Sequence, residues 1–334
     1  MILVTGATGL LGSHLLVELL KSDRKVRALY RDKQKIKLVE QLFDYYFQRT
    51  THRFNQIEWM QADVLDLVSL DDAFQGITEV YHCAALVSFN RKDFKNMIHV
   101  NRLGTANVVN FALKYGVKKL GHVSSTAVFT AKENGEVTEQ TKWQISDTTS
   151  GYAISKYNSE REVWRATEEG LDVLIINPSV IFGAGNLSES SLAIFKTVKN
   201  GLKVYSPGCN AFVDARDVAH CFVQLMESNI KNERFLCVGH NLSFKESMDT
   251  IATAFSKKAP TICPPKWMAL LMGRTNELLY RFFGIKPTIT LESARSAYSS
   301  TRYSNSKIVE QTKHTFFSFQ ETVNNVVAFD KKRS

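Results

Sequence analysis

Two residues four positions apart could carry out acid–base chemistry. Tyr152 and Lys156 fall in Gly151–Glu169, a segment with helical periodicity, so their side chains would share one face. A phenol has an ordinary pKa of about 10, so proton exchange near neutral pH needs a neighbouring cation, which Lys156 supplies. Ser124 and Ser125 end an upstream strand, where a hydroxyl could polarise a carbonyl oxygen. Together these side chains would suit proton transfer at such an oxygen.

A glycine-rich turn could hold the phosphates of a dinucleotide. Residues Thr5–Gly12 form a Gly-x-x-Gly-x-x-Gly pattern between an expected strand and an expected amphipathic helix. Glycines permit the tight turn and a close backbone approach to a pyrophosphate, and the helix N-terminus offers free N–H groups. A turn without any ligand is the alternative. The expected cofactor-binding residues here are Gly6, Thr8, Gly9, Leu10, Leu11 and Gly12.

The end of the second expected strand bears on the choice between NAD and NADP. An NAD site usually places an acid there to bind the ribose 2′-hydroxyl. Tyr30 stands at that place, Arg31 follows it and Lys35 is near, so positive charge would meet a 2′-phosphate. We therefore favour NADP(H), with Arg31 and Lys35 as ligands. A one-residue shift would put Asp32 on the ribose, which leaves NAD(H) open, and a solvated surface role is the alternative for Arg31.

These residues require a scaffold that brings strand ends together. Short β-branched runs alternate with helical patterns, which indicates a parallel sheet covered on both faces, a Rossmann-type doubly wound α/β fold. The expected strands are Ile2–Thr5, Lys25–Tyr30, Ile57–Gln61, Glu79–His82, Lys119–Ser124 and Val173–Asn177. The expected helices are Leu10–Lys21, Lys33–Phe47, Leu67–Phe74, Phe94–Tyr115 and Gly151–Glu169. Ligands of such sheets bind at the carboxyl ends of the strands, where the motifs fall.

The regularity weakens after Asn177-Pro178. We expect residues 1–177 to form the nucleotide-binding domain and residues 178–330 a smaller, mostly helical substrate-binding part. A strand near Arg234–Val238 is expected to return to the main sheet, so the two parts would interleave.

Composition excludes several classes of protein. With 334 residues, 44% hydrophobic and 22% charged, the chain is neither disordered nor collagen-like, and five cysteines without zinc spacing indicate no metal site. The start of the chain lacks a secretion-signal pattern and no apolar run is long enough for a transmembrane segment, so we expect a cytoplasmic protein. The net charge of +9 is scattered without an aromatic-interleaved basic motif, so no nucleic-acid partner is expected.

With these motifs in order, the chain resembles an extended short-chain dehydrogenase/reductase of the NAD(P)-dependent epimerase/dehydratase superfamily. The resemblance runs through nearly the whole chain. Its blocks are Thr5–Gly12, Asp63-Val64, His82–Ala85, Asn101–Thr105, Ser124-Ser125, Tyr152–Lys156, Asn177-Pro178 and Phe212–Val218.

The resemblance implies roles for the central residues. Tyr152 would be the general acid/base, Lys156 would lower its pKa and hold the nicotinamide ribose, and Ser125, in preference to Ser124, would hydrogen-bond the reacting oxygen. Asn101 would support the cofactor side of the pocket, with helix-internal hydrogen bonding as the alternative. The segment after Pro178 would meet the carboxamide.

Smaller signals complete the expected cofactor site. Asp63, before Val64, could accept a hydrogen bond from the adenine amino group or instead cap the next helix. The small residues Ala84 and Ala85 would let the backbone lie beside the ribose and phosphates. His82 is expected to be a packed, hydrogen-bonded histidine. Ser124, Tyr152 and Lys156 complete the expected cofactor contacts.

Departures from the family pattern bear on the substrate. Asn210 stands where nucleotide-sugar enzymes usually carry a diphosphate-binding arginine. The Val26–Arg31 pattern and the region from Pro264 to Lys307 resemble the dihydroflavonol reductase and 3β-hydroxysteroid dehydrogenase-like branch. We expect reduction of a ketone or aldehyde of a small apolar molecule, or the reverse oxidation of an alcohol. A nucleotide-sugar epimerase or dehydratase with NAD and a non-catalytic NADP-binding sensor are the alternatives.

Two further expectations concern contacts between surfaces. Trp267–Phe283 carries apolar residues at helical spacing, which could line a substrate pocket, pack in a core or meet another subunit. The resemblance also allows a homodimer through the helices near Phe94–Tyr115 and Gly151–Glu169.

Overall fold

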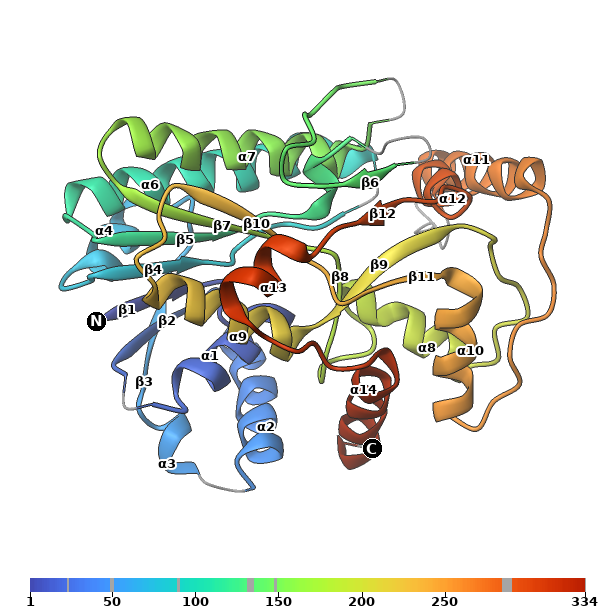
Figure 1. The fold of residues 1–334 in the computed structure, drawn as a ribbon, viewed down its shortest axis with the longest axis horizontal. Coiled ribbons are helices and arrows are strands. Elements are labelled where there is room, and N and C mark those ends of the chain that lie inside the picture. Colours follow the sequence, from blue (N-terminus) through green and yellow to red (C-terminus); the bar gives the residue numbers. More distant parts are fainter. Residues whose placement is uncertain are drawn as a thin grey trace.

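A seven-stranded parallel sheet is the centre of the molecule (Figure 1). The computed structural model describes residues 1–22, 24–48, 51–88, 91–130, 135–146, 149–283 and 290–333. The strand order is β10-β7-β5-β4-β1-β2-β3. Its strands are β1 (Ile2–Thr5), β2 (Val26–Tyr30), β3 (Ile57–Gln61), β4 (Glu79–His82), β5 (Lys119–Val123), β7 (Asp172–Pro178) and β10 (Glu233–Cys237). The predicted doubly wound Rossmann-type fold is confirmed.

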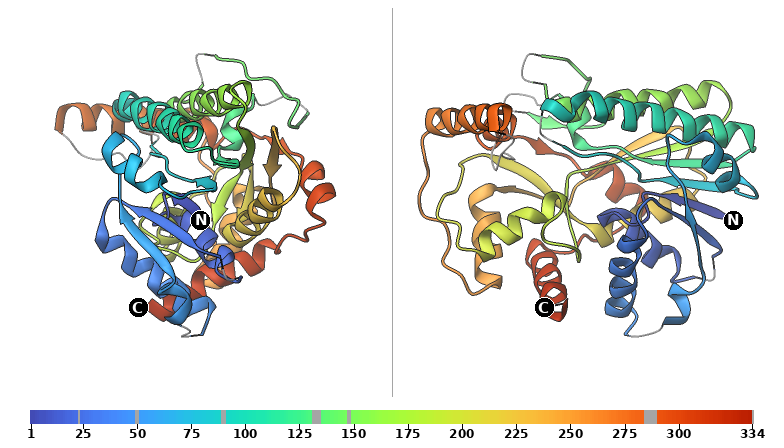
Figure 2. Two further views of the ribbon diagram at one scale, coloured as in Figure 1. Left: turned by 90° about the vertical axis from the view of Figure 1, so that its left-hand side faces the viewer. Right: turned by 180° about the vertical axis from the view of Figure 1, so that it is seen from behind.

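Helices cover both faces of this sheet, as the two layers in Figure 2 show. One face carries α4 (Leu67–Phe74), α5 (Phe94–Ile98), the π-helical turn η3 (His99–Leu103), α6 (Gly104–Lys114) and α7 (Gly151–Glu168). The other carries α1 (Leu10–Leu19), α2 (Ile36–Tyr46), α3 (Thr51–Phe54) and α9 (Ala215–Glu227). Because both faces are covered, the central strands are mostly apolar in their middle positions, and Ile2–Thr5 is buried throughout. A separate apolar core fills each side of the sheet.

The second half of the chain contains more strand than the sequence indicated. A three-stranded sheet has the order β11-β9-β8, and a short parallel pair joins β6, which lies in the first half, to β12. These strands are β6 (Glu136–Val137), β8 (Val180–Phe182), β9 (Cys209–Asp214), β11 (His240–Ser243) and β12 (Arg302–Tyr303). The helices are α8 (Ala193–Lys199), α10 (Phe244–Ala254), α11 (Lys266–Phe283), α12 (Leu291–Ser296), α13 (Ser306–Thr312) and α14 (Phe319–Arg333). Single-turn 3-10 helices are η1 (Lys33–Lys35), η2 (Arg91–Asp93), η4 (Thr126–Val128) and η5 (Ser190–Leu192).

The chain passes between the two halves more than once. After β9 and α9 it returns to the main sheet as β10, which pairs in parallel with β7, and then leaves again as β11. The carboxyl ends of β1, β4, β5 and β7 meet at one edge of the sheet, and α7 begins there. Among the described residues, no helix is long and apolar enough to cross a membrane.

Candidate functional site

The turn between β1 and α1 is built around positions that admit no side chain. Gly6 has a φ of +66°, and a Cβ on it would lie 2.6 Å from the backbone nitrogen of Ala84. A Cβ on Gly12 would lie 2.2 Å from the Gly6 carbonyl oxygen. Gly9 is the N-cap of α1, where neither a capping side chain nor a first-turn acid covers the free N–H groups. The turn therefore presents bare backbone donors, which suits an anionic phosphate.

The other predicted residues of this turn contribute backbone. Thr8 is half-buried in the turn itself. Leu10 begins α1 and packs against the core of the second half, and Leu11 is buried in the core beneath the sheet. Their backbone N–H groups, at the start of the helix, are the parts that could face a phosphate.

Charged residues gather where β2 and β3 end. Arg31 is exposed, and its Nη1 lies 3.7 Å from Oδ2 of Asp63. The Oδ1 of Asp32 accepts a hydrogen bond from the Gln34 backbone nitrogen at 2.9 Å and caps η1. Lys35 lies 3.7 Å from Glu189. One carboxylate oxygen of the acid that could have met a ribose thus caps η1, whereas the exposed cation Arg31 lies beside Asp63.

The acidic residue that caps α4, the helix after β3, is not Asp63, for which the sequence left a capping role open. Asp66, not Asp63, is the N-cap of α4, and its side chain accepts from the Val68 nitrogen. The Oδ1 of Asp63 accepts from the Leu65 nitrogen at 2.9 Å in a turn of its own. The capping alternative for Asp63 is therefore wrong, because the chain makes one extra turn before α4 begins.

Several predicted cofactor residues form a packed support beside this turn. Val64 is buried against Gly104, where an added Cβ would lie 2.6 Å from its Cγ2. Ala84 donates its backbone N–H to the Thr5 hydroxyl at 3.2 Å, and Ala85 continues the same segment. The small side chains leave this backbone next to Gly6.

Asn101 lies on the π-helical turn η3 and is 1% exposed. Its Oδ1 accepts from the Leu86 nitrogen at 2.6 Å, and its Nδ2 donates to the Leu86 carbonyl oxygen at 2.9 Å and to the Ser155 hydroxyl at 3.0 Å. The side chain thus joins the segment after β4 to α7, rather than bonding within its own helix. π-Helical turns are frequent at functional sites, where they redirect a side chain.

The predicted catalytic residues meet at the start of α7. Ser150 caps this helix through the Ala153 nitrogen and so fixes the orientation of its first turn. Tyr152 is hydrogen-bonded to Ser125, which follows β5. Lys156 lies one turn further along and is 3% exposed, and its Nζ donates to the Val123 carbonyl oxygen at 2.7 Å. The three side chains therefore come together at the carboxyl end of β5.

Burial is the main cause of the pKa shifts of Tyr152 and Lys156. It raises the pKa of Tyr152, and the hydrogen bond from Ser125 opposes that shift. Burial lowers the pKa of Lys156 to about 8, while Cys83 and Glu160 act in the opposite direction. Burial dominates the pKa of Tyr152, and the Lys156 ammonium donates to the Val123 carbonyl oxygen. The lowering of the tyrosine pKa by Lys156 therefore stays a prediction. The phenol is protonated at neutral pH.

Glu160, which sequence reasoning missed, organises the ends of three strands. It lies four residues after Lys156 and is 3% exposed. Its Oε2 accepts from the hydroxyl of Ser124 at 2.7 Å and from Nδ2 of Asn177 at 3.0 Å. Its Oε1 accepts from Arg234 and Trp164, each at 3.2 Å. One signal could have found it: a lone acid on the helix face that carries Tyr152 and Lys156.

This network extends to the predicted residues of β5 and β7. Asn177 also donates to the Ser125 carbonyl oxygen at 3.2 Å, so Glu160 acts on the serine through Asn177. Ser124 donates its hydroxyl to Glu160 and is 2% exposed, which leaves Ser125 as the serine beside Tyr152. Pro178 ends β7. Within the described residues, Asn177 Oδ1 and the buried Ser179 Oγ meet no hydrogen-bond partner, so two polar atoms beside Pro178 are available to a ligand.

Two stacked histidines lie beneath Lys156. His82 is hydrogen-bonded to Thr5 at 2.7 Å and to Thr105 at 2.9 Å, as a packed residue. Its ring lies 5.2 Å from that of His122. Burial, with Lys156 nearby, lowers the pKa of His82 to about 3 and that of His122 well below its ordinary value. Both rings are neutral at pH 7, so Lys156 is the cation of this cluster.

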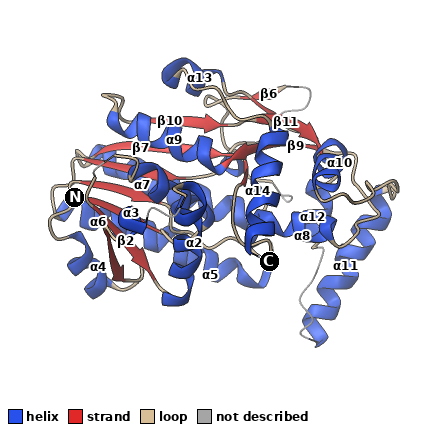
Figure 3. Ribbon diagram, turned by 90° about the horizontal axis from the view of Figure 1, so that it is seen from below, coloured by secondary structure: helices blue, strands red, loops and turns tan. Residues whose placement is uncertain are grey.

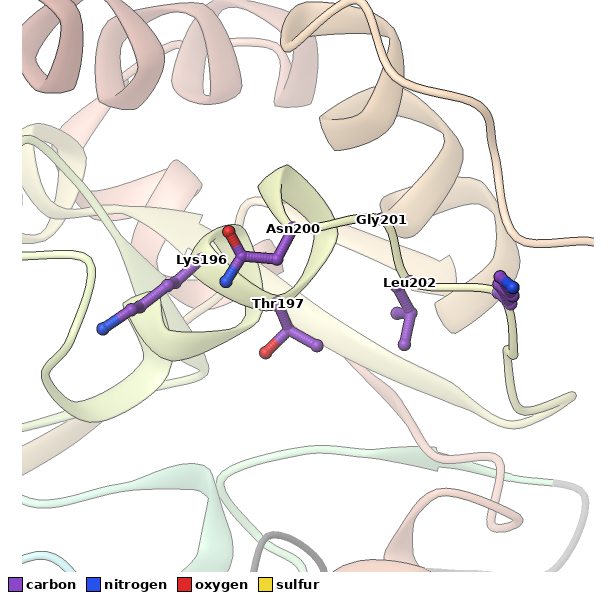
Figure 4. Close-up of a pocket in the computed structure, with 6 residues that line it drawn as sticks. Lys196, Thr197, Asn200, Gly201 and Leu202 are labelled. Atoms are coloured by element: carbon purple, nitrogen blue, oxygen red, sulfur yellow. The ribbon is translucent and has the colours of Figure 1, made fainter.

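A surface hollow elsewhere does not belong to this arrangement. It has a volume of about 450 Å³ and lies at the end of α8 (Figure 4). It is lined by Lys196, Thr197, Asn200, Gly201, Leu202 and Lys203. None of the residues predicted to carry chemistry lines it, so the candidate site is the edge where β1, β4, β5 and β7 end.

Comparisons with known proteins agree with this geometry. The model of the NAD dependent epimerase/dehydratase family matches residues 2–239. Sterol demethylase protein B of Methylococcus capsulatus is 29% identical over 311 residues, which cover 91% of this chain and 90% of that protein. Cinnamoyl-CoA reductase 1 of Petunia hybrida is 28% identical, with 78% of this chain and 79% of that protein covered. Dihydroflavonol 4-reductase of Gerbera hybrida is 26% identical, covering 73% and 69% respectively.

A solved structure supports the same fold. The crystal structure of gox2253 superposes with a TM-score of 0.81 at 24% identity, covering 100% of this chain and 98% of that one. The family model spans both the glycine turn and the Tyr152–Lys156 pair, so the match includes the candidate site. The chain belongs to the NAD-dependent epimerase/dehydratase family, its relatives include dihydroflavonol reductase-like proteins, and it is an NAD(P)-dependent oxidoreductase of the extended short-chain dehydrogenase/reductase type.

Proposed function

We propose that this protein is an NADPH-dependent reductase of a ketone or aldehyde on a small apolar molecule, with Tyr152 as the proton donor. The observation that carries the proposal is the meeting of Tyr152 with Ser125, above a buried Lys156, at the carboxyl end of β5. This arrangement places an acid beside a second hydroxyl, which is what a carbonyl oxygen needs as it gains a proton.

Each residue of the group has a separate part in the reaction. The raised pKa of Tyr152 keeps a proton on its phenol oxygen, ready for transfer to the substrate oxygen. Ser125 orients that phenol and would hydrogen-bond the same oxygen as charge develops on it. The Lys156 ammonium favours the phenolate that remains after transfer. Asn101 and Glu160 hold these elements in place through Ser155 and Asn177.

The residues present fit a dinucleotide cofactor. The glycine turn with bare N–H groups would hold the pyrophosphate, and the unpartnered Ser179 Oγ and Asn177 Oδ1 are suited to an amide. NADPH, when bound, supplies a hydride for the carbonyl carbon. Exposed Arg31 would bind the 2′-phosphate, and Asp32 is committed to capping η1, so NADP(H) is favoured over NAD(H).

Two observations favour a carbonyl compound over a nucleotide sugar. Asn210 lies on β9, and its Oδ1 accepts from the Ala211 nitrogen, so this position offers no cation to a diphosphate. The names of the relatives support the same choice, since cinnamoyl-CoA reductase and dihydroflavonol 4-reductase name aromatic carbonyl compounds. The sterol demethylase relative extends the class to apolar ring systems.

Titration calorimetry with NADP(H) and NAD(H) tests the proposal on wild type, Arg31→Ala and the control Lys37→Ala. Lys37 is an exposed cation on α2, six residues after Arg31, so the control removes the same charge without the proposed phosphate contact. We expect wild type to prefer NADP(H) and Arg31→Ala to lose roughly tenfold or more in NADP(H) affinity, as for a charge-assisted hydrogen bond. NAD(H) affinity and Lys37→Ala should be unchanged.

The opposite result would identify the alternative function. A preference for NAD(H), unaffected at Arg31, would contradict the NADP assignment and favour an epimerase that retains NAD. A wild type that binds NADPH tightly but oxidises it with none of a panel of aromatic and alicyclic ketones and aldehydes would favour a non-catalytic sensor.

A further inference from the structure

Helix α11 exposes a continuous apolar stripe. Its apolar side chains from Trp267 to Phe282 recur at helical spacing and are largely in solvent, with Trp267 64% and Phe282 72% exposed. At 3.6 residues per turn they occupy an arc of roughly 140°, interrupted only by Thr275. The members of the stripe are Trp267, Met268, Leu271, Met272, Leu278, Leu279 and Phe282. A row of this length is unlike scattered surface apolar residues, and such patches mark interaction sites.

The opposite side of α11 is the one attached to the protein. A Cβ on Gly273 would lie 2.9 Å from the Leu291 Cα, so α12 begins directly against the helix. The Leu291 nitrogen donates to Glu277 at 3.0 Å. Near the other end, the Lys92 ammonium lies 3.9 Å from the centroid of the Tyr280 ring. These contacts fix which side of α11 faces the protein and leave the apolar stripe facing outward.

Charge distinguishes the classes of partner. Besides its apolar stripe, α11 carries the cations Lys266, Arg274 and Arg281, and its one acid is Glu277. Glu277 is directed to α12 by the hydrogen bond to Leu291, whereas Lys266 and Arg274 are exposed. At 100° per residue, Arg274 borders the stripe, whereas Lys266 lies at the first position of the helix on its other side. An apolar face with Trp, Leu and Phe on a helix with exposed basic residues is the pattern of helices that lie in the plane of a membrane interface. The chain as a whole has a net charge of +9.

The position of α11 allows such contact. Figure 3 shows α11 at the end of the molecule away from the N-terminus, extending beyond the neighbouring helices. Its contact with Lys92 of η2 also places it near the segment that follows β4, next to the candidate site. A flat surface could therefore approach the stripe without meeting the central sheet.

We propose that α11 binds an anionic lipid bilayer, with its apolar stripe in the interface and Arg274, at the border of the stripe, against lipid phosphates. This is attachment to one leaflet, because the apolar residues occupy one side of the helix. A second copy of the chain is less favoured, since two such helices would bring their basic flanks together. The inference goes beyond the proposed reductase activity and is tested without any substrate.

Vesicle flotation tests the proposal with phosphatidylcholine alone and with phosphatidylcholine containing phosphatidylglycerol. Wild type should float with the anionic vesicles, and the emission of Trp267 should shift to the blue, a shift that Trp267→Phe removes. The double variant Leu271→Glu, Leu278→Glu should lose about tenfold or more in binding. Arg274→Gln should lose about fivefold on anionic vesicles. Val68→Glu, an equivalent change at an exposed residue of α4, should bind like wild type.

Three outcomes would overturn the proposal. One is a wild type that binds neither vesicle, and another is equal binding to neutral and anionic vesicles. The third is a dimer in sedimentation velocity without lipid that the double variant dissociates, which would assign the stripe to a second copy. Because the fluorescence shift is measured on wild type, a double variant that fails to fold does not leave the question open.

Discussion

The edge of the sheet around Glu160 buries polar side chains, whereas the stripe on α11 exposes apolar ones. At the strand ends, polar groups are buried and most are paired. Glu160 alone accepts hydrogen bonds from four side chains, those of Ser124 after β5, Asn177 on β7, Arg234 on β10 and Trp164 on α7. On α11, apolar groups are exposed along about four helical turns of a single side. Each arrangement costs free energy in an isolated molecule, since buried charge must be desolvated and exposed apolar surface orders water.

The difference indicates which function each region serves. Buried polar groups fix one geometry, which serves chemistry that depends on positions accurate to fractions of an ångström. Exposed apolar groups fix no geometry within the chain. They contribute a favourable free energy of burial only when a partner covers them. Substitutions should therefore separate the two regions: changes at the edge should affect catalysis and folding, and changes on α11 should affect only attachment.

The largest effect is expected for Tyr152→Phe. Removal of the hydroxyl removes the proton donor while the ring still packs, so kcat for carbonyl reduction should fall by about 10²–10⁴-fold. Steady-state NADPH oxidation measures kcat, and calorimetry should show a far smaller change in NADPH affinity than in kcat. Binding to anionic vesicles should be that of wild type, and a loss of vesicle binding would break the proposed separation of the two regions.

Glu160→Gln should have the next largest effect, on folding. The amide keeps the shape but removes the buried negative charge that accepts from Arg234, Ser124 and Asn177, so the free energy of unfolding should fall by about 2–3 kcal/mol. Urea denaturation measures this change.

Glu162→Gln on the same helix is the matched control for that experiment. Glu162 pairs with Arg102 and Arg165, whose side chains are 59% and 37% exposed, so its loss should cost at most about 1 kcal/mol. Equal effects of the two variants would show that the buried network is not the stabilising feature of the edge.

Sequence patterns located the parts of the site that are local in the chain. The glycine turn, the end of β2 and the Tyr152–Lys156 pair each depend on residues within one strand–turn–helix unit, where spacing determines geometry. The Glu160 network could not be found this way, because it joins residues 17 to 74 positions apart. The cap of α4 differed because one extra turn moved it from Asp63 to Asp66.

The stripe on α11 shows a second limit of sequence patterns. Periodicity indicated an amphipathic helix over Trp267–Phe283, and the structure has that helix as Lys266–Phe283. Periodicity cannot say whether the apolar face meets a core, a pocket or solvent, since the spacing is the same in each case. That depends on the contact of Gly273 and Glu277 with α12, whose position the spacing does not encode.

The pH dependence of the reaction tests the electrostatics of the edge. Because burial lowers the pKa of Lys156 from 10.5 to about 8, its ammonium is present below that pH and is lost above it. The rate of carbonyl reduction should therefore fall above pH 8, to roughly a tenth one unit higher if the cation is required. Lys156→Arg keeps its charge at these pH values, so its profile should lack this fall even if its rate is lower. Vesicle binding, which relies on the apolar stripe and exposed Arg274, should show no such transition near pH 8.

The smallest effect is expected for polar substitution of the α11 stripe. Leu271→Ser and Leu278→Ser replace side chains that are 54% and 52% exposed, so the free energy of unfolding should change by no more than about 0.5 kcal/mol each. Urea denaturation without lipid measures this change, and NADPH oxidation should match that of wild type. A loss of 2 kcal/mol or more, as is typical of a buried leucine, would show that the stripe packs within the protein in solution. The comparison with Glu160 would then fail, because both regions would contribute to the folding of the same chain.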